Sequence, residues 1–340
     1  MSRIYVLHEN PAWIDPFAEA FSRRGLPWSE WPIDQGVVDL GRAPPEGVFY
    51  SRISASSHTR DHRFAPDYTA ALLAWLERHG RRVVNGLGAL DLEISKVRQY
   101  AALEAAGLRV PRTVAVVGKD HVVEAARQAF GNGPVILKPN RGGKGLGVQL
   151  FQAVEGLAGY LAGPAYEAPV DGVHLLQEYV QAPEPVITRA EFVGGRFLYA
   201  VEVDTTGGFE LCPADACAVG DAFCPAGPEP GLAGPEAGLA GPGEPAEPRP
   251  KFRIVDGIDP QLQGAYEGFL ARNGIEIAGI EFIRGLDGEV RTYDVNTNTN
   301  YNADAERRAG RSGPDAIAEF LGRELARLSD QARLPLEAAE

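Results

Sequence analysis

Apolar and polar positions along residues 1–84 alternate in a way that predicts an α/β layer. Short apolar runs typical of buried strands are followed by segments whose apolar residues recur on one helical face. In chain order these are a strand at 3–7, a helix at 16–24, a strand at 47–52, a helix at 68–79 and a strand at 82–85. Strands and helices in such alternation build an open sheet covered by helices.

The pattern continues through the middle of the chain with longer helical segments. Residues 89–106 predict one long helix that ends at Gly107. The elements expected after it are a strand at 114–117, a helix at 122–130, and two strands, 135–137 and 148–151, that flank a glycine-rich loop.

The last part of the chain predicts two β-hairpins and two helices. A strand at 174–180 precedes a hairpin that turns at Gly194-Gly195, and a second hairpin turns at residues 286–288, where Leu-Asp-Gly is a strong turn signal. Helices are expected at 259–273 and 316–328.

Composition indicates two or three packed subdomains and one disordered insert. The chain has 340 residues, of which 44% are hydrophobic and 23% are charged, as in an ordinary soluble globular protein of that size. Residues 225–250 are instead rich in proline and glycine and cannot build a core, so we expect this insert to be disordered.

The formal net charge of -13 argues against a nucleic acid or an anionic membrane as the main partner, because both require a dominant basic surface. The sequence contains no apolar run of about 18 residues and no signal-peptide pattern, so a cytoplasmic location is the default expectation. Cys212, Cys217 and Cys224 have no metal-binding spacing, and we expect reduced thiols.

Glycine and positive charge crowd the loop between the two middle strands. Its glycines can take positive φ and let the backbone close on a ligand, and its cations suit a polyphosphate. The residues are Arg141, Gly142, Gly143, Lys144, Gly145 and Gly147. A glycine-rich hairpin turn with solubilising charges would have the same composition, so the loop alone leaves both interpretations open. The Lys-Ser/Thr pair of a P-loop is missing from it.

The second hairpin carries three oxygen-bearing side chains, Glu281, Asp294 and Asn296. The period of two places Asp294 and Asn296 on one face of their strand, and antiparallel pairing can bring Glu281 opposite them. Two carboxylates and an amide oxygen are hard ligands that suit Mg²⁺. The alternative is that Asp294 and Asn296 only begin a turn in the polar run that follows.

Two polar segments are candidates for substrate recognition. One follows the strand at 47–52 and the other follows the metal-ligand hairpin. Their candidate residues are Arg52, Ser54, Arg60 and Arg63 in the first and Asn298, Asn300 and Asn302 in the second. Ligands of open α/β sheets bind beyond the carboxyl ends of strands, but a solvated loop that caps the next helix is an equally good interpretation of the first segment.

The order of these features resembles the ATP-grasp family, in particular the branch of ribosomal-protein glutamate ligases, lysine-biosynthesis ligases and glutathione synthetase-like enzymes. A helix-start lysine, a strand-edge lysine, the glycine loop, a strand ending QEYV, a strand arginine and the acidic hairpin follow one another over residues 85–325. The resemblance implies an α/β ATP-grasp fold with an N-terminal α/β domain at 1–84, a small subdomain at 85–175 and a large subdomain at 176–330 that contains the insert.

The resemblance also implies roles for individual residues. Lys96, which on its own would be an ordinary surface lysine, would meet the nucleotide phosphates, and Lys138 would lie beside adenine and the α-phosphate. The loop from Arg141 to Gly147 would close over the phosphates. The remaining roles are an adenine-binding hinge at Gln177, Glu178, Tyr179 and Val180, a ribose contact at Glu184, catalytic cations at Arg189, Arg141 and Lys144, and Mg²⁺ ligands at Glu281, Asp294 and Asn296.

The sequence departs from the family at the metal ligands. Glu281 stands where many relatives carry Asp, and Asp294 stands where many carry Glu, but two carboxylates are kept. The implied activity is an ATP- and Mg²⁺-dependent carboxylate–amine ligase that uses two ions, with Mn²⁺ as an acceptable substitute, and acts on a small-molecule or peptide carboxylate. Alternatives are a ligase for a protein carboxylate, an ATP-grasp kinase, and a nucleotide-binding partner without turnover. A homo-oligomer is compatible with all of these.

Overall fold

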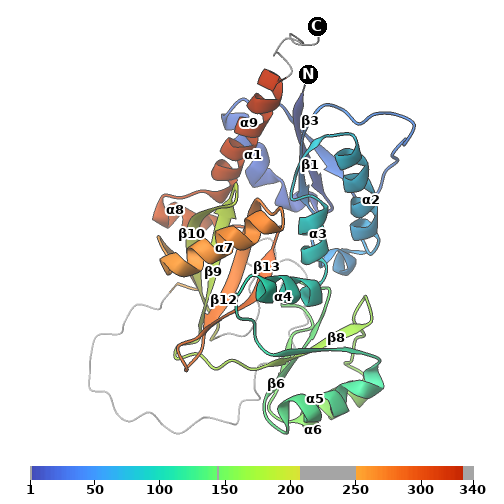
Figure 1. Ribbon diagram of the computed structural model, residues 1–340, viewed down its shortest axis with the longest axis vertical. Coiled ribbons are helices and arrows are strands. Elements are labelled where there is room, and N and C mark those ends of the chain that lie inside the picture. Colours follow the sequence, from blue (N-terminus) through green and yellow to red (C-terminus); the bar gives the residue numbers. More distant parts are fainter. Residues whose placement is uncertain (1, 144, 207–249, 332–340) are drawn as a thin grey trace.

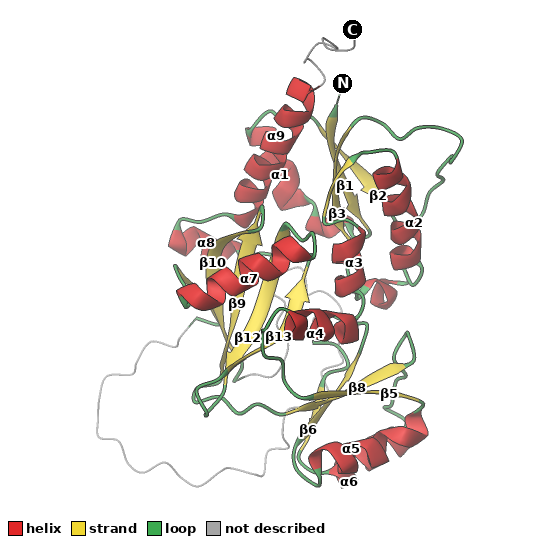
Figure 2. Cartoon of the chain, viewed as in Figure 1, coloured by secondary structure: helices red, strands yellow, loops and turns green. Residues whose placement is uncertain are grey.

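The computed structural model describes residues 2–143, 145–206 and 250–331, which form three sheets with their covering helices (Figures 1 and 2). Outside the described residues lie Lys144, the cysteines Cys212, Cys217 and Cys224, and the predicted insert at 225–250 except for Pro250. Within the described ranges, every helix is too short or too polar to cross a membrane. The predicted mixture of helices and strands is confirmed.

The first sheet is parallel and has the order β2-β1-β3-β4. Its strands are β1 (Arg3–His8), β2 (Trp28–Pro32), β3 (Gly47–Arg52) and β4 (Arg82–Val84). Side chains alternate across a strand, so Ile4 and Val6 face one layer of helices while Leu7 faces the other. Helices α1 (Asp15–Arg23) and α9 (Gly313–Gln331) cover the first face, and α2 (Ala65–Arg78) covers the second. The last described helix therefore completes the core of the first layer (Figure 1).

The second sheet is antiparallel, has the order β5-β8-β6-β7, and lies at the far end of the molecule from α9 (Figure 1). Its strands are β5 (Thr113–Val117), β6 (Val135–Pro139), β7 (Gln149–Phe151) and β8 (Val173–Glu178). Apolar side chains of α5 (Val122–Phe130) and α6 (Val154–Ala162) pack on it. The predicted pairing of the two strands that flank the glycine loop is confirmed as β6 and β7.

The third sheet is antiparallel and has the order β11-β10-β9-β12-β13. Its strands are β9 (Val186–Val193), β10 (Arg196–Asp204), β11 (Phe252–Val255), β12 (Ile277–Arg284) and β13 (Val290–Asn296). Both predicted hairpins, β9–β10 and β12–β13, are confirmed. Helix α7 (Pro260–Arg272) and helix α4 (Lys96–Ala105) bury apolar residues against this sheet, and α8 (Ala303–Ala309) follows β13.

The predicted single helix at 89–106 is wrong, because the chain forms α3 (Leu87–Glu93) and then α4. The break falls at Ser95, whose hydroxyl caps α4 by accepting from the Arg98 N–H. Asn140, from the second sheet, adds a tertiary cap: its Oδ1 accepts from the Val97 N–H at 2.9 Å and its backbone oxygen accepts from the Lys96 N–H at 3.2 Å. Lys96 is therefore the first residue of a helix. Short 3₁₀ helices at Pro11–Trp13, Ser57–Arg60 and Lys119–His121 complete the set of described helices.

Candidate functional site

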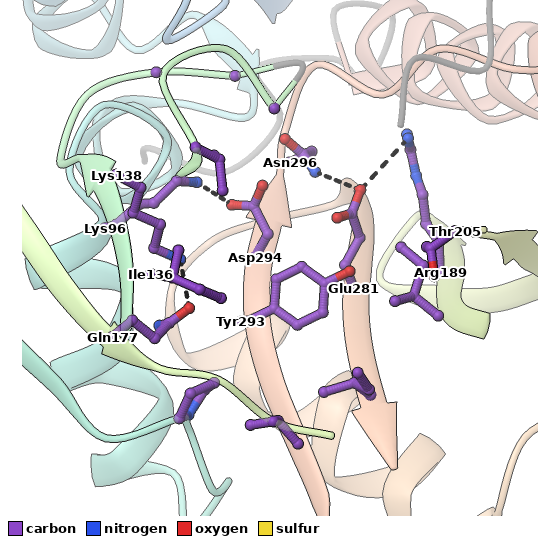
Figure 3. Close-up of a pocket in the computed structure, with 18 of the residues that line it drawn as sticks. Lys96, Ile136, Lys138, Gln177, Arg189, Thr205, Glu281, Tyr293, Asp294 and Asn296 are labelled. Atoms are coloured by element: carbon purple, nitrogen blue, oxygen red, sulfur yellow. Dashed lines mark hydrogen bonds and ion pairs between the residues drawn. The ribbon is translucent and has the colours of Figure 1, made fainter. Parts of the chain in front are cut away.

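A cavity of about 630 Å³ lies where the three sheets meet, and most of the predicted site residues line it (Figure 3). The predicted residues on its wall are Ser54, Lys96, Lys138, Gly142, Gly143, Gly145, Gln177, Glu178, Tyr179, Val180, Glu184, Arg189, Glu281, Asp294, Asn296, Asn298 and Asn300. Residues as far apart in the sequence as Ser54 and Asn300 thus face one space.

Lys96 begins α4 and points to β13, where its Nζ lies 2.5 Å from Oδ1 of Asp294 (Figure 3). Both side chains are largely buried. Burial on its own would lower the pKa of Lys96, but the Asp294 carboxylate outweighs it and raises that pKa above its ordinary value. Lys96 is therefore a permanent cation at the cavity wall, next to a carboxylate.

Lys138, on β6, is held by two neutral groups rather than by a carboxylate. Its Nζ lies 2.5 Å from the Tyr100 hydroxyl and 2.9 Å from Oε1 of Gln177. Burial, and then the charge of Lys96, lower the pKa of Lys138 to about 7. Since this lysine is only half protonated near neutral pH, an anionic ligand beside it would favour its charged form.

The β12–β13 hairpin brings its two carboxylates together as predicted, because Glu281 and Asp294 are partners in the strand register. Nδ2 of Asn296 donates to Oε1 of Glu281 at 3.3 Å. Burial and the Asp294 carboxylate raise the pKa of Glu281 to about 7, while Arg189 opposes the shift. Two facing carboxylates that repel each other, with an amide beside them, form a donor set that fits a hard divalent cation such as Mg²⁺.

Arg189 reaches the same carboxylate from the neighbouring strand β9, with NH1 3.9 Å from Oε1 of Glu281. Its Nε lies 2.7 Å from Oε1 of Glu191, and its NH2 donates to the Thr299 hydroxyl. Thr299 in turn donates to Oε2 of Glu191 at 2.8 Å. A Cβ on Gly279 would lie only 2.5 Å from Nε of Arg189, so the glycine makes room for the guanidinium. These contacts fix Arg189 at the cavity wall.

The described part of the glycine loop packs against the end of β6 and comes near the early polar segment. Gly145 and Gly147 have φ of 76° and 73°, which favours glycine at both positions. A Cβ on Gly142 would lie 2.9 Å from Pro139, and one on Gly143 would lie 3.6 Å from Ser56 of the first layer. Arg141 and Gly147 do not line the cavity. The backbone here approaches the early polar segment closely.

The segment predicted as the adenine-binding hinge ends β8 and continues as cavity wall to Ile187. Gln177 is buried, with its Nε2 donating to Thr113 Oγ1 at 2.8 Å and to the Tyr100 hydroxyl at 3.2 Å. Glu178 lies 3.3 Å from Nε of Arg291. This wall is therefore built from a fixed amide and a paired carboxylate.

The early polar segment supplies fewer cavity residues than the sequence suggested. Arg52 is only 1% exposed and lies behind the cavity wall. Its NH2 donates to the backbone oxygen of Thr299 at 3.2 Å and to Oδ1 of Asn300 at 3.1 Å. Arg60 forms a pair of hydrogen bonds with Glu9, and Arg63 is exposed away from the cavity-lining set. Ser54 lines the cavity, with its hydroxyl 2.9 Å from that of Ser56.

In the second polar segment, Asn298 and Asn300 line the cavity, whereas Oδ1 of Asn302 caps α8 by accepting from the Ala305 N–H at 2.8 Å. Within the described part of the chain, Oδ1 of Asn298 is buried without a hydrogen-bond partner. A buried amide of this kind on a cavity wall is a candidate ligand contact.

Several residues that shape the site were not predicted from the sequence. Tyr100 follows Lys96 by four positions, which places both on one face of α4, and Glu191 follows Arg189 by two, which places both on one face of β9. Those spacings could have found them. Thr299 and Gly279 gave no local signal, because their roles depend on partners far away in sequence.

No protein-family model matches the chain, and no curated protein matches it in sequence. Solved structures do match. The ATP-grasp ligase PsnB, complexed with minimal precursor, Mg and ADP, is 16% identical and covers 95% of this chain and 97% of its own, with a TM-score of 0.60. The D-cycloserine synthetase DcsG is 18% identical and covers 95% of this chain and 99% of its own, with a TM-score of 0.60. A RimK domain ATP-grasp protein from Sphaerobacter thermophilus DSM 20745 is 18% identical and covers 94% of this chain and 99% of its own, with a TM-score of 0.61.

These likenesses extend over almost the whole of each chain. The protein has the ATP-grasp fold, and the prediction made from the order of its motifs is confirmed at the level of the fold.

Proposed function

We propose that the protein is an ATP- and Mg²⁺-dependent carboxylate–amine ligase. The observation that carries the proposal is the composition of the cavity between the three sheets, where Lys96, Lys138 and Arg189 face the paired carboxylates of Glu281 and Asp294. Three basic side chains and an acidic pair in one cavity suit a nucleotide triphosphate with its metal ion. The solved structure of PsnB, which has the same fold, contains ADP and Mg.

The reaction would occur in two steps. A carboxylate oxygen of the first substrate attacks the γ-phosphorus of ATP, a P–O bond forms, and the bond to the β-phosphate oxygen breaks to release ADP. The amine nitrogen of the second substrate then attacks the acyl carbon, a C–N bond forms, phosphate leaves, and the nitrogen loses a proton. No covalent bond to the protein is required, so its contribution is orientation and electrostatic stabilisation.

The cavity residues divide this work between them. Lys96 and Arg189 are fixed by Asp294 and by Glu191 respectively, and they would stabilise negative charge as the phosphoryl group moves. Glu281, Asp294 and Asn296 would hold Mg²⁺, which when bound offsets charge on the phosphates. The glycine loop, which comes near Ser56 at Gly143, would cover the cavity when nucleotide is bound, and exclusion of water would protect the acyl phosphate from hydrolysis.

We propose a small-molecule or peptide carboxylate as the first substrate. PsnB is complexed with a peptide precursor in several solved structures, and DcsG is a D-cycloserine synthetase, so proteins with this fold include both kinds. We propose that this substrate binds at the polar wall formed by Ser54, Asn298 and Asn300, which line the same cavity.

An ADP-release screen tests the proposal. Purified protein is incubated with ATP, Mg²⁺ and pairs of candidate substrates drawn from free amino acids, short peptides and dicarboxylates. In a parallel set, hydroxylamine replaces the second substrate as a general amine. We expect ADP release that depends on a particular carboxylate, and a hydroxamate of that carboxylate as product. The variant Lys96→Met is the control and should release no ADP. Nucleotide binding without carboxylate-dependent ADP release in any pair would contradict the proposal and favour a binding protein without turnover.

A further inference from the structure

Strand β13 is an edge of the third sheet, and its outer backbone groups bond to α4 and to Arg109, in the segment after α4, rather than to another strand. An unpaired backbone group at a buried edge is unfavourable, so each needs a partner. Gln99 of α4 supplies two at once: its Nε2 donates to the Val295 oxygen at 2.8 Å and its Oε1 accepts from the Val295 N–H at 2.9 Å. Side chains of α3 and α4 thus take the place of a neighbouring strand.

The same row of contacts continues on both sides of Val295. Glu93 of α3 accepts from the Thr297 N–H at 2.7 Å, and the Tyr100 hydroxyl of α4 donates to the Tyr293 oxygen at 2.8 Å. Between these two contacts, Lys96 forms an ion pair with the side chain of Asp294. The position of the proposed metal ligand therefore depends on how α4 sits against the edge of β13.

Tyr100 lies behind the cavity wall and contacts two residues that line the cavity, Lys138 and Gln177. Its hydroxyl has one proton, which goes to the Tyr293 carbonyl, because a carbonyl can only accept. The two remaining contacts must then be accepted by the hydroxyl oxygen, from Lys138 Nζ at 2.5 Å and from Gln177 Nε2 at 3.2 Å. One buried hydroxyl therefore uses all its hydrogen-bonding capacity to join three strands, β6, β8 and β13.

We propose that Tyr100 is a positioning residue that couples nucleotide binding to Mg²⁺ binding. A ligand that binds Lys138 or Gln177 changes the hydrogen bonds that these residues donate to the Tyr100 hydroxyl. Because the same hydroxyl donates to the carbonyl of Tyr293, this change reaches the residue next to Asp294. By the same route, a cation held at Asp294 would favour the arrangement that binds nucleotide, since coupling between two sites is reciprocal. This inference rests on the proposed function only for the nucleotide and metal sites, and not for turnover.

Titration of ADP by calorimetry, with and without Mg²⁺, tests the coupling without any substrate. The measured quantity is the ratio of the ADP Kd without Mg²⁺ to the Kd with Mg²⁺. In Tyr100→Phe we expect this ratio to fall at least fivefold, which is about 1 kcal/mol of coupling. Tyr266→Phe is the matched control, because it removes another buried hydroxyl that bonds to β13, at Thr292 Oγ1, outside the cavity. Its ratio should stay within twofold of wild type.

The outcomes separate the inference from the proposed function. A Tyr100→Phe ratio within twofold of wild type would show that the hydroxyl only supports packing, and an equal fall in both variants would show a general loss of rigidity. Thermal unfolding of both variants checks that they fold. If the wild-type protein binds no ADP at all, the proposed nucleotide site is wrong, and the proposed coupling is wrong as well.

Hydrogen exchange on the wild-type protein gives a second test that needs no variant. ADP alone, without Mg²⁺, should slow the exchange of the Val295 N–H and its neighbours in β13. Unchanged exchange in β13, with slower exchange in β8, would show that the nucleotide binds without reaching the metal-ligand strand and would overturn the coupling.

Discussion

Lys96 and Asp294 form an ion pair with Nζ 2.5 Å from Oδ1, although they lie 198 residues apart in the sequence. The pair joins the first turn of α4 to the strand that carries the proposed metal ligands. If Asp294 also binds a metal ion, as proposed, its buried carboxylate has two functions, which substitution can separate.

Asp294→Asn should keep the fold but abolish most turnover. The amide has the same shape and its oxygen can still accept from Lys96, but it is neutral and binds Mg²⁺ weakly. Loss of a preorganised electrostatic group costs about 3–4 kcal/mol in the barrier, so we expect the rate of ADP release to fall by two to three orders of magnitude. The binding of ADP without Mg²⁺, measured by calorimetry, should stay within a few-fold of wild type. Full Mg²⁺-dependent activity in this variant would show that the hairpin does not hold the metal.

Nucleotide binding should take up a proton at Lys138. Its pKa is lowered to about 7, so most of it is neutral at pH 8, and the phosphates favour the charged form. Calorimetry of ADP in buffers with different ionisation enthalpies should show uptake approaching about one proton at pH 8 and much less at pH 6. In Lys138→Met the uptake should disappear. A wild-type protein that binds ADP at pH 8 without proton uptake would mean that Lys138 is already charged.

The lowered pKa of Lys138 also makes the free energy of unfolding depend on pH. Between pH 7 and the ordinary lysine value of 10.5, the unfolded chain binds a proton at Lys138 that the folded protein does not. The contribution of Lys138 to the free energy of unfolding therefore rises with pH across this window and is lost as the pH falls towards 7.

Gly279→Ala should displace Arg189 without preventing nucleotide binding. The new Cβ would lie 2.5 Å from Nε of Arg189, whose position is fixed by Glu191 and Thr299, so the guanidinium must move. We expect ADP release to fall more than tenfold, while the Kd of ADP changes little. Gly264→Ala is the control: it lies exposed in α7 with nothing within 4 Å of its Cβ, and it should leave activity unchanged. It should also stabilise the helix by about 0.5–1 kcal/mol. Equal activity of both variants would remove Arg189 from the catalytic set.

Glu281 and Asp294 face each other as expected from the hairpin pattern, but their pairing also needs a bulge between Glu281 and Phe282, without which the register that pairs Phe282 with Thr292 would place Tyr293 opposite Glu281. The pairing of β12 with β13 itself could be predicted, because the Leu286-Asp287-Gly288 turn and the period of two are local signals. The same holds for the strands on either side of the glycine loop. Hairpins are decided by neighbours in the chain, so their sequence signals are strong.

The break between α3 and α4 could not be predicted in this way. The apolar pattern continues through Ser95, and the tertiary partner that caps α4, Asn140, lies in another sheet. Strand β2 was missed for a related reason: its residues, WSEWP, include a glutamate and a proline and show no buried position, and they form a strand only because β1 offers them a parallel partner. The position of Arg52 behind the cavity wall likewise depends on Thr299 and Asn300, which come late in the chain.

The packing of α9 on the first sheet bears on how the protein is synthesised. Ile4, Val6 and Val48 form one core with Phe17 of α1 and with Ile317 and Leu321 of α9, so this face of the sheet is covered only in part, by α1, until the ribosome has made α9. Helix α9 follows β4 by about 230 residues, and at 5–20 residues per second the delay is roughly 10–50 s. During that time an apolar surface of the nascent chain is available to chaperones or to other nascent chains. The core of the first layer is therefore completed only after α9 has been made, even though the strands of the layer emerge first.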